Sequence, residues 1–185
     1  MDFENNGRAN RKRRIFLDTE TTGMSRSSDR IVEVCAIEVD DAFNEIDSFH
    51  AFINPKRQVP WFVTRIHGLN NEFLDDKPVF GEIGRDLLLF LEGSELWAHN
   101  MSFDAGMLNA EFVRNRLPTL EKVDCRLNCT LQLARSTFPG QKNSLDALLD
   151  RFAINRSERK LHGAMIDTRL LVKVYQNLVS YRAKN

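Results

Sequence analysis

Four carboxylates and one histidine are the residues of this sequence that could do chemistry together. They are Asp18, Glu20, Asp104, His162 and Asp167, and each lies at the edge of an apolar run where a fold can hold it rigidly. Carboxylates that converge and stay ionised need a cation to offset their repulsion, and hard oxygen ligands favour Mg²⁺ or Mn²⁺ over zinc. With the histidine as a proton acceptor, the set is suited to metal-assisted hydrolysis of a phosphodiester.

Asp18 and Glu20 are two positions apart. If residues 18–20 continue a strand, both side chains point to the same face, where one metal could contact both. The following Thr21, Thr22 and Gly23 supply backbone N–H groups and flexibility near a bound phosphate. Taken alone, Asp-x-Glu is a weak signal, because an acidic turn whose side chains cap backbone groups is more common.

Asp104 and Asp167 each have an ordinary explanation as well. An aspartate at the start of a helix, as expected for Asp104, is favoured by the helix dipole. Asp104 also follows a short apolar strand, however, and sites in α/β sheets form beyond strand ends. Asp167 lies on the apolar face of the last expected helix, where an unpaired carboxylate is costly. A salt bridge to Arg169 or Arg151 is the alternative to a metal.

Of the four histidines, His162 is the candidate base. It precedes Asp167 by five residues, and at ~3.6 residues per turn the two cannot share a helix face. His162 is therefore expected on the loop before the helix, where an imidazole with a pKa near ~6.5 suits proton transfer. A surface histidine is the alternative. His67 is a further candidate, whereas a packing role is expected for His99 and a structural one for His50.

Composition limits the class of protein. The chain has 185 residues, 42% of them hydrophobic, with 26 Lys+Arg and 26 Asp+Glu. This balance argues against a protein that coats long nucleic acids but not against an enzyme that grips a strand end. The polar N-terminus is no secretory signal and the apolar runs are too short to span a bilayer. The odd count of three cysteines fits a reducing cytoplasm, and Cys125 and Cys129 are expected to be free thiols.

Periodicity predicts an α/β fold with a mixed sheet. We expect a disordered lead-in over residues 1–12 and a single domain over 13–182. Strands are expected at 13–18, 31–39, 46–53, 95–98 and 122–125. Helices are expected at 60–66, 72–75, 80–91, 103–114, 129–137, 144–152 and 164–178, with Ser144 as a helix N-cap.

Taken together, three motifs resemble those of the DEDDh (DnaQ-like) 3′–5′ exonucleases. They are Asp18-Thr-Glu-Thr-Thr-Gly23, His99-Asn-x-x-Phe-Asp104 and His162-Gly-Ala-x-x-Asp167. The resemblance implies a ribonuclease H-like fold with a five-stranded mixed sheet. It also implies two Mg²⁺ (or Mn²⁺) ions held by the four acids, with His162 as general base. The residues it places near the terminal nucleotide are Thr19, Thr21, Thr22, Gly23, Met24, His67, Asn100 and Phe103.

Within that family, the sequence is most similar to the proofreading epsilon subunits of bacterial DNA polymerase III. The segments that carry this similarity are residues 66–69, 138–148 and 161–164. It implies removal of nucleoside 5′-monophosphates from a single-stranded or frayed 3′ end of DNA, with the polymerase III core as a partner. Epsilon subunits usually continue into a polymerase-binding tail, whereas this sequence ends at Asn185. The alternatives are an exoribonuclease resembling ribonuclease T or oligoribonuclease, and a non-catalytic module that binds strand ends or a polymerase.

Overall fold

The computed structural model describes residues 13–157 and 161–184, and the expected lead-in over 1–12 lies outside them. A five-stranded sheet in the order β3-β2-β1-β4-β5 forms the centre of the fold. β2 is antiparallel to both β1 and β3, whereas β4 is parallel to β1 and β5. The predicted mixed sheet is thus confirmed. The strands are β1 (Arg14–Thr21), β2 (Ile31–Val39), β3 (Glu45–Phe52), β4 (Glu95–Ala98) and β5 (Arg126–Cys129).

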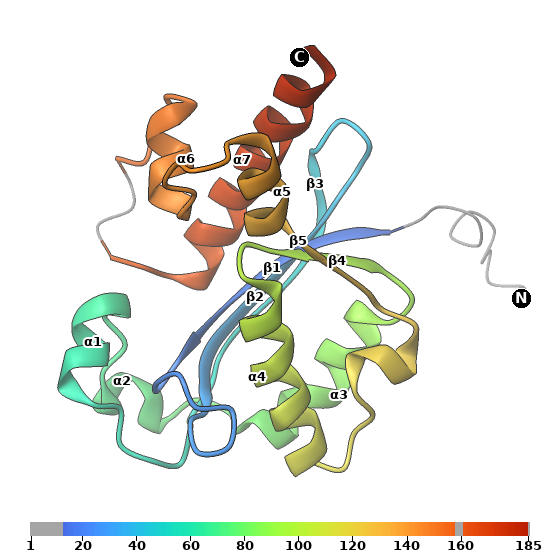
Figure 1. Cartoon of the computed structure of the whole chain (residues 1–185). Coiled ribbons are helices and arrows are strands. Elements are labelled where there is room, and N and C mark those ends of the chain that lie inside the picture. Colours follow the sequence, from blue (N-terminus) through green and yellow to red (C-terminus); the bar gives the residue numbers. More distant parts are fainter. Residues whose placement is uncertain (1–12, 158–160, 185) are drawn as a thin grey trace, which may run out of the picture.

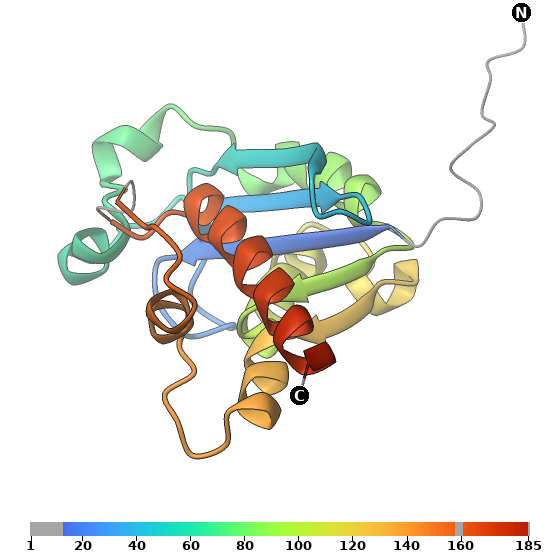
Figure 2. The same ribbon diagram turned by 90° about the horizontal axis from the view of Figure 1, so that it is seen from above.

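Helices cover both faces of this sheet (Figures 1 and 2). α3 and α4 pack on one face, and α7 crosses the other with α5 and α6 beside it. The short helices α1 and α2 lie near the end of β1 that carries the acids. The helices are α1 (Trp61–His67), α2 (Asn71–Asp75), α3 (Phe80–Leu91), α4 (Met101–Arg114), α5 (Thr130–Thr137), α6 (Leu145–Arg151) and α7 (Ala164–Lys184), with a 3₁₀ turn, η1 (Leu120–Val123).

The central strand β1 decides which acids face which helix. Ile15 and Leu17 are fully buried in the cluster that includes α3 and α4, whereas Phe16 is buried in the cluster that includes α7. Because strand side chains alternate between faces, Asp18 and Glu20 continue the side of Phe16. The apolar half of β1 therefore anchors the strand, and its last residues present acids toward the start of α7.

The prediction of a strand at 122–125 is wrong. Residues 120–123 form the turn η1, which ends where Asp124 adopts a left-handed conformation with φ 58°. The backbone N–H of Cys125 donates to the carbonyl of Leu120, and this closes the turn. The fifth strand is instead β5, which pairs with β4 beginning at Arg126 opposite Glu95. β5 is an edge strand with only partly buried side chains, so it lacks the apolar alternation that marks an interior strand.

The remaining elements agree with prediction to within a few residues, except that α7 runs to Lys184, beyond the expected end at 178. Ser144 is the N-cap of α6 and accepts from the N–H of Ala147. His99 has the predicted packing role, since its ring contacts the Thr130 hydroxyl and the Asn143 carbonyl. All three cysteines are free thiols. Within 13–157 and 161–184, no helix is long and apolar enough to cross a membrane.

Candidate active site

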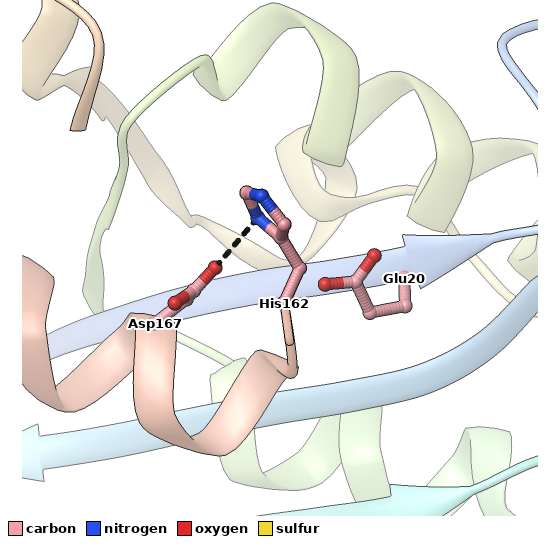
Figure 3. A group of neighbouring side chains, drawn as sticks. All are labelled: Glu20, His162 and Asp167. Carbon is pink, nitrogen blue, oxygen red and sulfur yellow. Dashed lines mark ion pairs between the residues drawn. The ribbon is translucent and has the colours of Figure 1, made fainter. Parts of the chain in front are cut away.

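The acids of β1 meet the start of α7. Asp167 lies in the first turn of α7 and is only 4% exposed, while His162 lies on the segment just before this helix, as predicted. The Nδ1 atom of His162 is 3.3 Å from Oδ2 of Asp167. One ligand atom each from Glu20, His162 and Asp167 fall within 4.8 Å of one another. Figure 3 shows how these three side chains converge from β1 and α7.

The arginines that offered an ordinary explanation for Asp167 have other partners. Arg169 Nε lies 3.1 Å from Glu45 Oε2 at the surface. Arg151 donates to the side-chain oxygen of Asn143. Asp167 pairs with His162, and its carboxylate lies close to Glu20 in the acid cluster.

Asp104 approaches the cluster from the other side of the sheet. It lies in the first turn of α4 and is 3% exposed. Thr19, which projects from β1 on the side opposite to Asp18, donates its hydroxyl to Asp104 Oδ1 at 2.8 Å. Burial raises the pKa of Asp104 to about 7, although the hydrogen bond from Thr19 opposes the shift.

Asp18 lies between these two halves of the site. Burial raises its pKa well above the ordinary value for aspartate, and the negative charges of Asp104, Glu20 and Asp167 raise it further. Without a cation, burial and the neighbouring negative charges therefore favour the protonated form of Asp18. A set of oxygen donors whose mutual repulsion has this effect fits hard divalent cations, which would both replace the protons and bind the oxygens.

A cavity of about 480 Å³ opens beside Glu20. Among the residues predicted to lie near a terminal nucleotide, Met24 and Phe103 bring apolar side chains to its wall. Asn100 does not belong to this wall; it caps α4, and its carbonyl accepts from the N–H of Phe103. The other predicted residues that line the cavity are Thr19, Thr21, Thr22, Gly23 and His67.

His67 ends α1 at the inner side of this cavity. It is 5% exposed, and its Nδ1 accepts from the backbone N–H of Leu69. Burial lowers its pKa, while a hydrogen bond with the Thr21 backbone acts in the opposite direction. Burial thus favours the neutral imidazole, which can serve as a hydrogen-bonding group beside the cavity.

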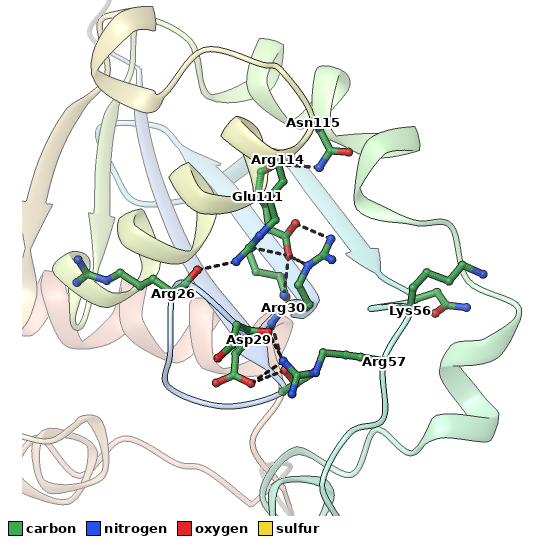
Figure 4. Close-up of polar contacts among 12 residues, drawn as sticks. Arg26, Asp29, Arg30, Lys56, Arg57, Glu111, Arg114 and Asn115 are labelled. Atoms are coloured by element: carbon green, nitrogen blue, oxygen red, sulfur yellow. Dashed lines mark hydrogen bonds and ion pairs between the residues drawn. The ribbon is translucent and has the colours of Figure 1, made fainter.

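The loop that carries Gly23 and Met24 is fixed by buried charges (Figure 4). Glu111 of α4 accepts from Arg30 at 2.6 and 2.9 Å, and its side chain is 1% exposed. Asp29 accepts from the Thr22 hydroxyl and fills the space beside Gly23, where an added Cβ would lie 2.5 Å from its carboxylate. The rim of the cavity is thus tied to α4, and a larger residue at position 23 would have to displace the Asp29 carboxylate.

Sequence reasoning missed the part of the cavity wall that comes from α1. Its residues are apolar, and a sequence cannot tell an apolar side chain at a cavity from one in a core. A short helix was predicted at 60–66, and α1 indeed lies there, from Trp61 to His67, ending at Gly68 with φ 79°. The missed lining residues of α1 are Phe62, Val63 and Ile66, and Pro60 just before α1 and Asp29 on the loop between β1 and β2 were missed as well.

A model of the exonuclease family RNase_T matches residues 15–175. The chain belongs to this exonuclease family. Its curated relatives include DNA polymerase III epsilon subunits. That of Rickettsia conorii is 46% identical over 177 residues, covering 92% of this chain and 75% of the relative. That of Buchnera aphidicola subsp. Acyrthosiphon pisum is 42% identical over 171 residues, covering 90% and 72%. The predicted relationship to epsilon-type 3′–5′ exonucleases is therefore confirmed.

Solved structures support the same fold. Exonuclease X in complex with 5′ overhanging duplex DNA has a TM-score of 0.67 and 26% identity, and the match covers 90% of this chain and 91% of that one. Exonuclease I has a TM-score of 0.79 at 18% identity, covering 92% of this chain and 41% of that one. The predicted ribonuclease H-like α/β fold is thus confirmed. Another of these structures is a zinc-bound form of exonuclease I from E. coli with single-stranded DNA.

Proposed function

We propose that this exonuclease hydrolyses DNA from its 3′ end, in two-metal-ion fashion, as a proofreading enzyme. The observation that carries the proposal is the meeting of acids from β1, α4 and α7 beside a cavity large enough for a nucleotide. Residues far apart in the sequence gather there although their charges repel. Such an arrangement is costly unless cations occupy it, and its place next to a cavity gives those cations a substrate.

In this proposal Asp18, Glu20, Asp104 and Asp167 hold two Mg²⁺ or Mn²⁺ ions. Bound metals of this kind lower the pKa of water and stabilise a leaving oxygen in an in-line displacement. The protein's own part is to fix four oxygen donors on three rigid elements, β1, α4 and α7. Two of these donors, Asp104 and Asp167, are buried, which limits the access of bulk water to them.

His162 acts as the general base. Its side chain is 46% exposed, so it can take a proton at the site and release it to solvent. It lies on the segment before α7, and its Nδ1 faces Asp167.

The cavity receives the terminal nucleotide in this account. Met24 is 77% exposed and lines the cavity together with Phe103, so their apolar surfaces are available to stack on a base. The surface of the cavity is mostly apolar, which favours low sequence preference. A mismatched end is preferred because it costs less to unpair.

The relatives support DNA as substrate and the polymerase III core as partner, since epsilon subunits cover nearly the whole chain at more than 40% identity. The same kinship supports a cytoplasmic location. Solved neighbours include complexes with DNA, such as that of exonuclease X with a 5′ overhanging duplex. A preference for RNA would require a site for the 2′-OH.

Incubation with a 3′-mispaired primer and Mg²⁺ tests the proposal. The expected products are nucleoside 5′-monophosphates released one at a time, with loss of activity in excess EDTA. A matched RNA oligonucleotide should be cut more slowly than the DNA. Faster cutting of RNA would assign the chain to the exoribonucleases. Binding without cleavage would indicate a non-catalytic module that binds strand ends.

A further inference from the structure

Glu33 is a buried carboxylate with no part in the predicted site. It lies on β2, is 3% exposed, and is directly opposite Glu20 in the pairing of β2 with β1. Like charges directly across a strand pair destabilise a sheet, and a buried carboxylate needs partners. Its neighbours Val32 and Val34 are fully buried and apolar, as this interior strand requires. A glutamate here breaks the local pattern, and such breaks concentrate at functional sites.

The carboxylate of Glu33 joins three elements. Its Oε1 lies 2.8 Å from Nε2 of His50 on β3. Its Oε2 accepts from the backbone N–H of Ala164 at 3.1 Å. Ala164 is the first residue of α7, whose early N–H groups have no partner within the helix. A carboxylate at this end also matches the positive pole of the helix dipole.

The start of α7 carries the catalytic side chains. His162 is two residues before Ala164, and its backbone N–H donates to the carbonyl of Ile66 at 3.1 Å. Asp167 lies in the first turn of the helix, and its N–H donates to the carbonyl of Gly163. The segment from His162 to Asp167 is therefore held from α1 on one side and from the sheet, through Glu33, on the other.

We propose that Glu33 is a positioning residue, which fixes the first turn of α7 so that His162 and Asp167 face Glu20. The inference rests on the proposed function. In this role the Glu33 side chain must be long enough to place an acceptor at the Ala164 N–H and a second polar atom at His50; we call this length its reach. Glutamine has the same length, with a carbonyl for Ala164 and an amide for His50. Aspartate keeps the charge but is one methylene too short for both contacts.

The pair Glu33→Asp and Glu33→Gln separates reach from charge. Glu33→Asp should lower kcat on the order of 10²-fold, the loss typical of a small misplacement of catalytic groups. It should also raise the Mn²⁺ concentration needed for half-maximal activity, because Asp167 moves. KM for the oligonucleotide should stay close to the wild-type value, since Glu33 does not line the cavity. Glu33→Gln should restore kcat and the Mn²⁺ dependence nearly to wild type.

Glu45→Gln is the matched control. The Glu45–Arg169 ion pair also joins β3 to α7, but both of its side chains are exposed. This variant should have wild-type kcat and Mn²⁺ dependence. Ala164→Pro reaches the same bond from the other side, because proline suits the first position of a helix and lacks the N–H. It should reproduce the loss of kcat expected for Glu33→Asp. If Glu33→Asp does not fold, Ala164→Pro tests the positioning role in its place.

A folded Glu33→Asp with wild-type kcat and Mn²⁺ dependence would overturn the inference. So would a Glu33→Gln as impaired as Glu33→Asp, since reach without the negative charge would then not be enough. Calorimetric titration with Mn²⁺ separates this failure from failure of the proposed function. If the wild type bound Mn²⁺ but cut no DNA, the function would fall, while weaker Mn²⁺ binding by Glu33→Asp than by Glu33→Gln would still support the positioning role.

Discussion

Two buried acids of the same helix have opposite surroundings. Asp104 and Glu111 are seven residues apart on α4, so they share a face, and they are 3% and 0% exposed. Glu111 is neutralised by Arg30 at 2.6 Å and approached by Arg114 at 3.5 Å. Asp104 receives the hydroxyl of Thr19 and lies beside another acid, Asp18.

The difference separates an acid that stabilises the fold from one that is kept for a ligand. A guanidinium partner offsets the burial of Glu111 within the protein itself, whereas the pKa of Asp104 is raised to about 7 by burial. The charge of Asp104 is thus left to be balanced by a bound cation. If this comparison is right, each acid should respond to substitution in a different measurement.

The largest expected effect is on turnover at the cluster. Asp104→Asn, Asp18→Ala and Asp167→Ala should each reduce cleavage of a 3′-mispaired primer below detection, because each removes a metal ligand. The proteins should stay folded, as judged by circular dichroism, since less negative charge is buried. Wild-type rates in any of them would remove that residue from the site.

Glu111→Ala should act on stability instead. Removing one partner of a buried ion pair leaves the other charge uncompensated, which costs about 3 kcal/mol of the free energy of unfolding. Urea denaturation measures this loss. Because the Glu111–Arg30 ion pair fixes the loop that carries Met24, any change in activity of the folded variant should fall on KM rather than on kcat. Unchanged stability would show that Glu111 and Asp104 do not differ as described.

His162→Ala should lower kcat by at least ~10²-fold while leaving Mn²⁺ binding largely intact, because a general base contributes rate and not cation affinity. The control is His99→Gln, whose ring packs against Thr130 and Asn143 outside the cavity. That variant should lose stability before it loses rate. Equal losses of kcat in the two histidine variants would contradict the assignment.

The metal-free protein should become less stable as pH rises from about 5 to 8. The pKa of Asp104 is raised in the folded state from 3.8 to about 7, so between these values the folded protein binds more protons than the unfolded chain. Stability contributed by this proton is present at low pH and is lost as pH rises through 7. Thermal melts in EDTA measure the effect, which Asp104→Asn should weaken and Mn²⁺ should abolish. A rise in melting temperature over this range would contradict it.

Much of the fold could be predicted because the central elements have strong periodicity. β2, α3 and β4 begin and end where the apolar pattern does, since they are interior or packed on one face. β5 could not be predicted this way. Its position depends on pairing with β4 and on the turn closed by the Cys125 N–H, neither of which leaves an apolar pattern in the sequence.

The chemistry of the site was readable from residue types, but its geometry was not. Spacing placed Asp18 and Glu20 on one face and His162 before a helix, because local periodicity fixes both. The hydrogen bond from Thr19 to Asp104 spans 85 residues, and that from Ala164 to Glu33 spans 131. Contacts of such length arise from the packing of the whole sheet. The contact of Glu33 with the start of α7 could therefore not be predicted from the sequence and became apparent only in the structure.

The most direct test is diffraction from a crystal soaked in Mn²⁺, using the anomalous signal of the ion. The account predicts peaks bounded by Asp18, Glu20, Asp104 and Asp167, within about 2.0–2.6 Å of carboxylate oxygens, and no peak at Glu111. Peaks elsewhere, or four carboxylates that stay protonated and bind no ion at neutral pH, would contradict it.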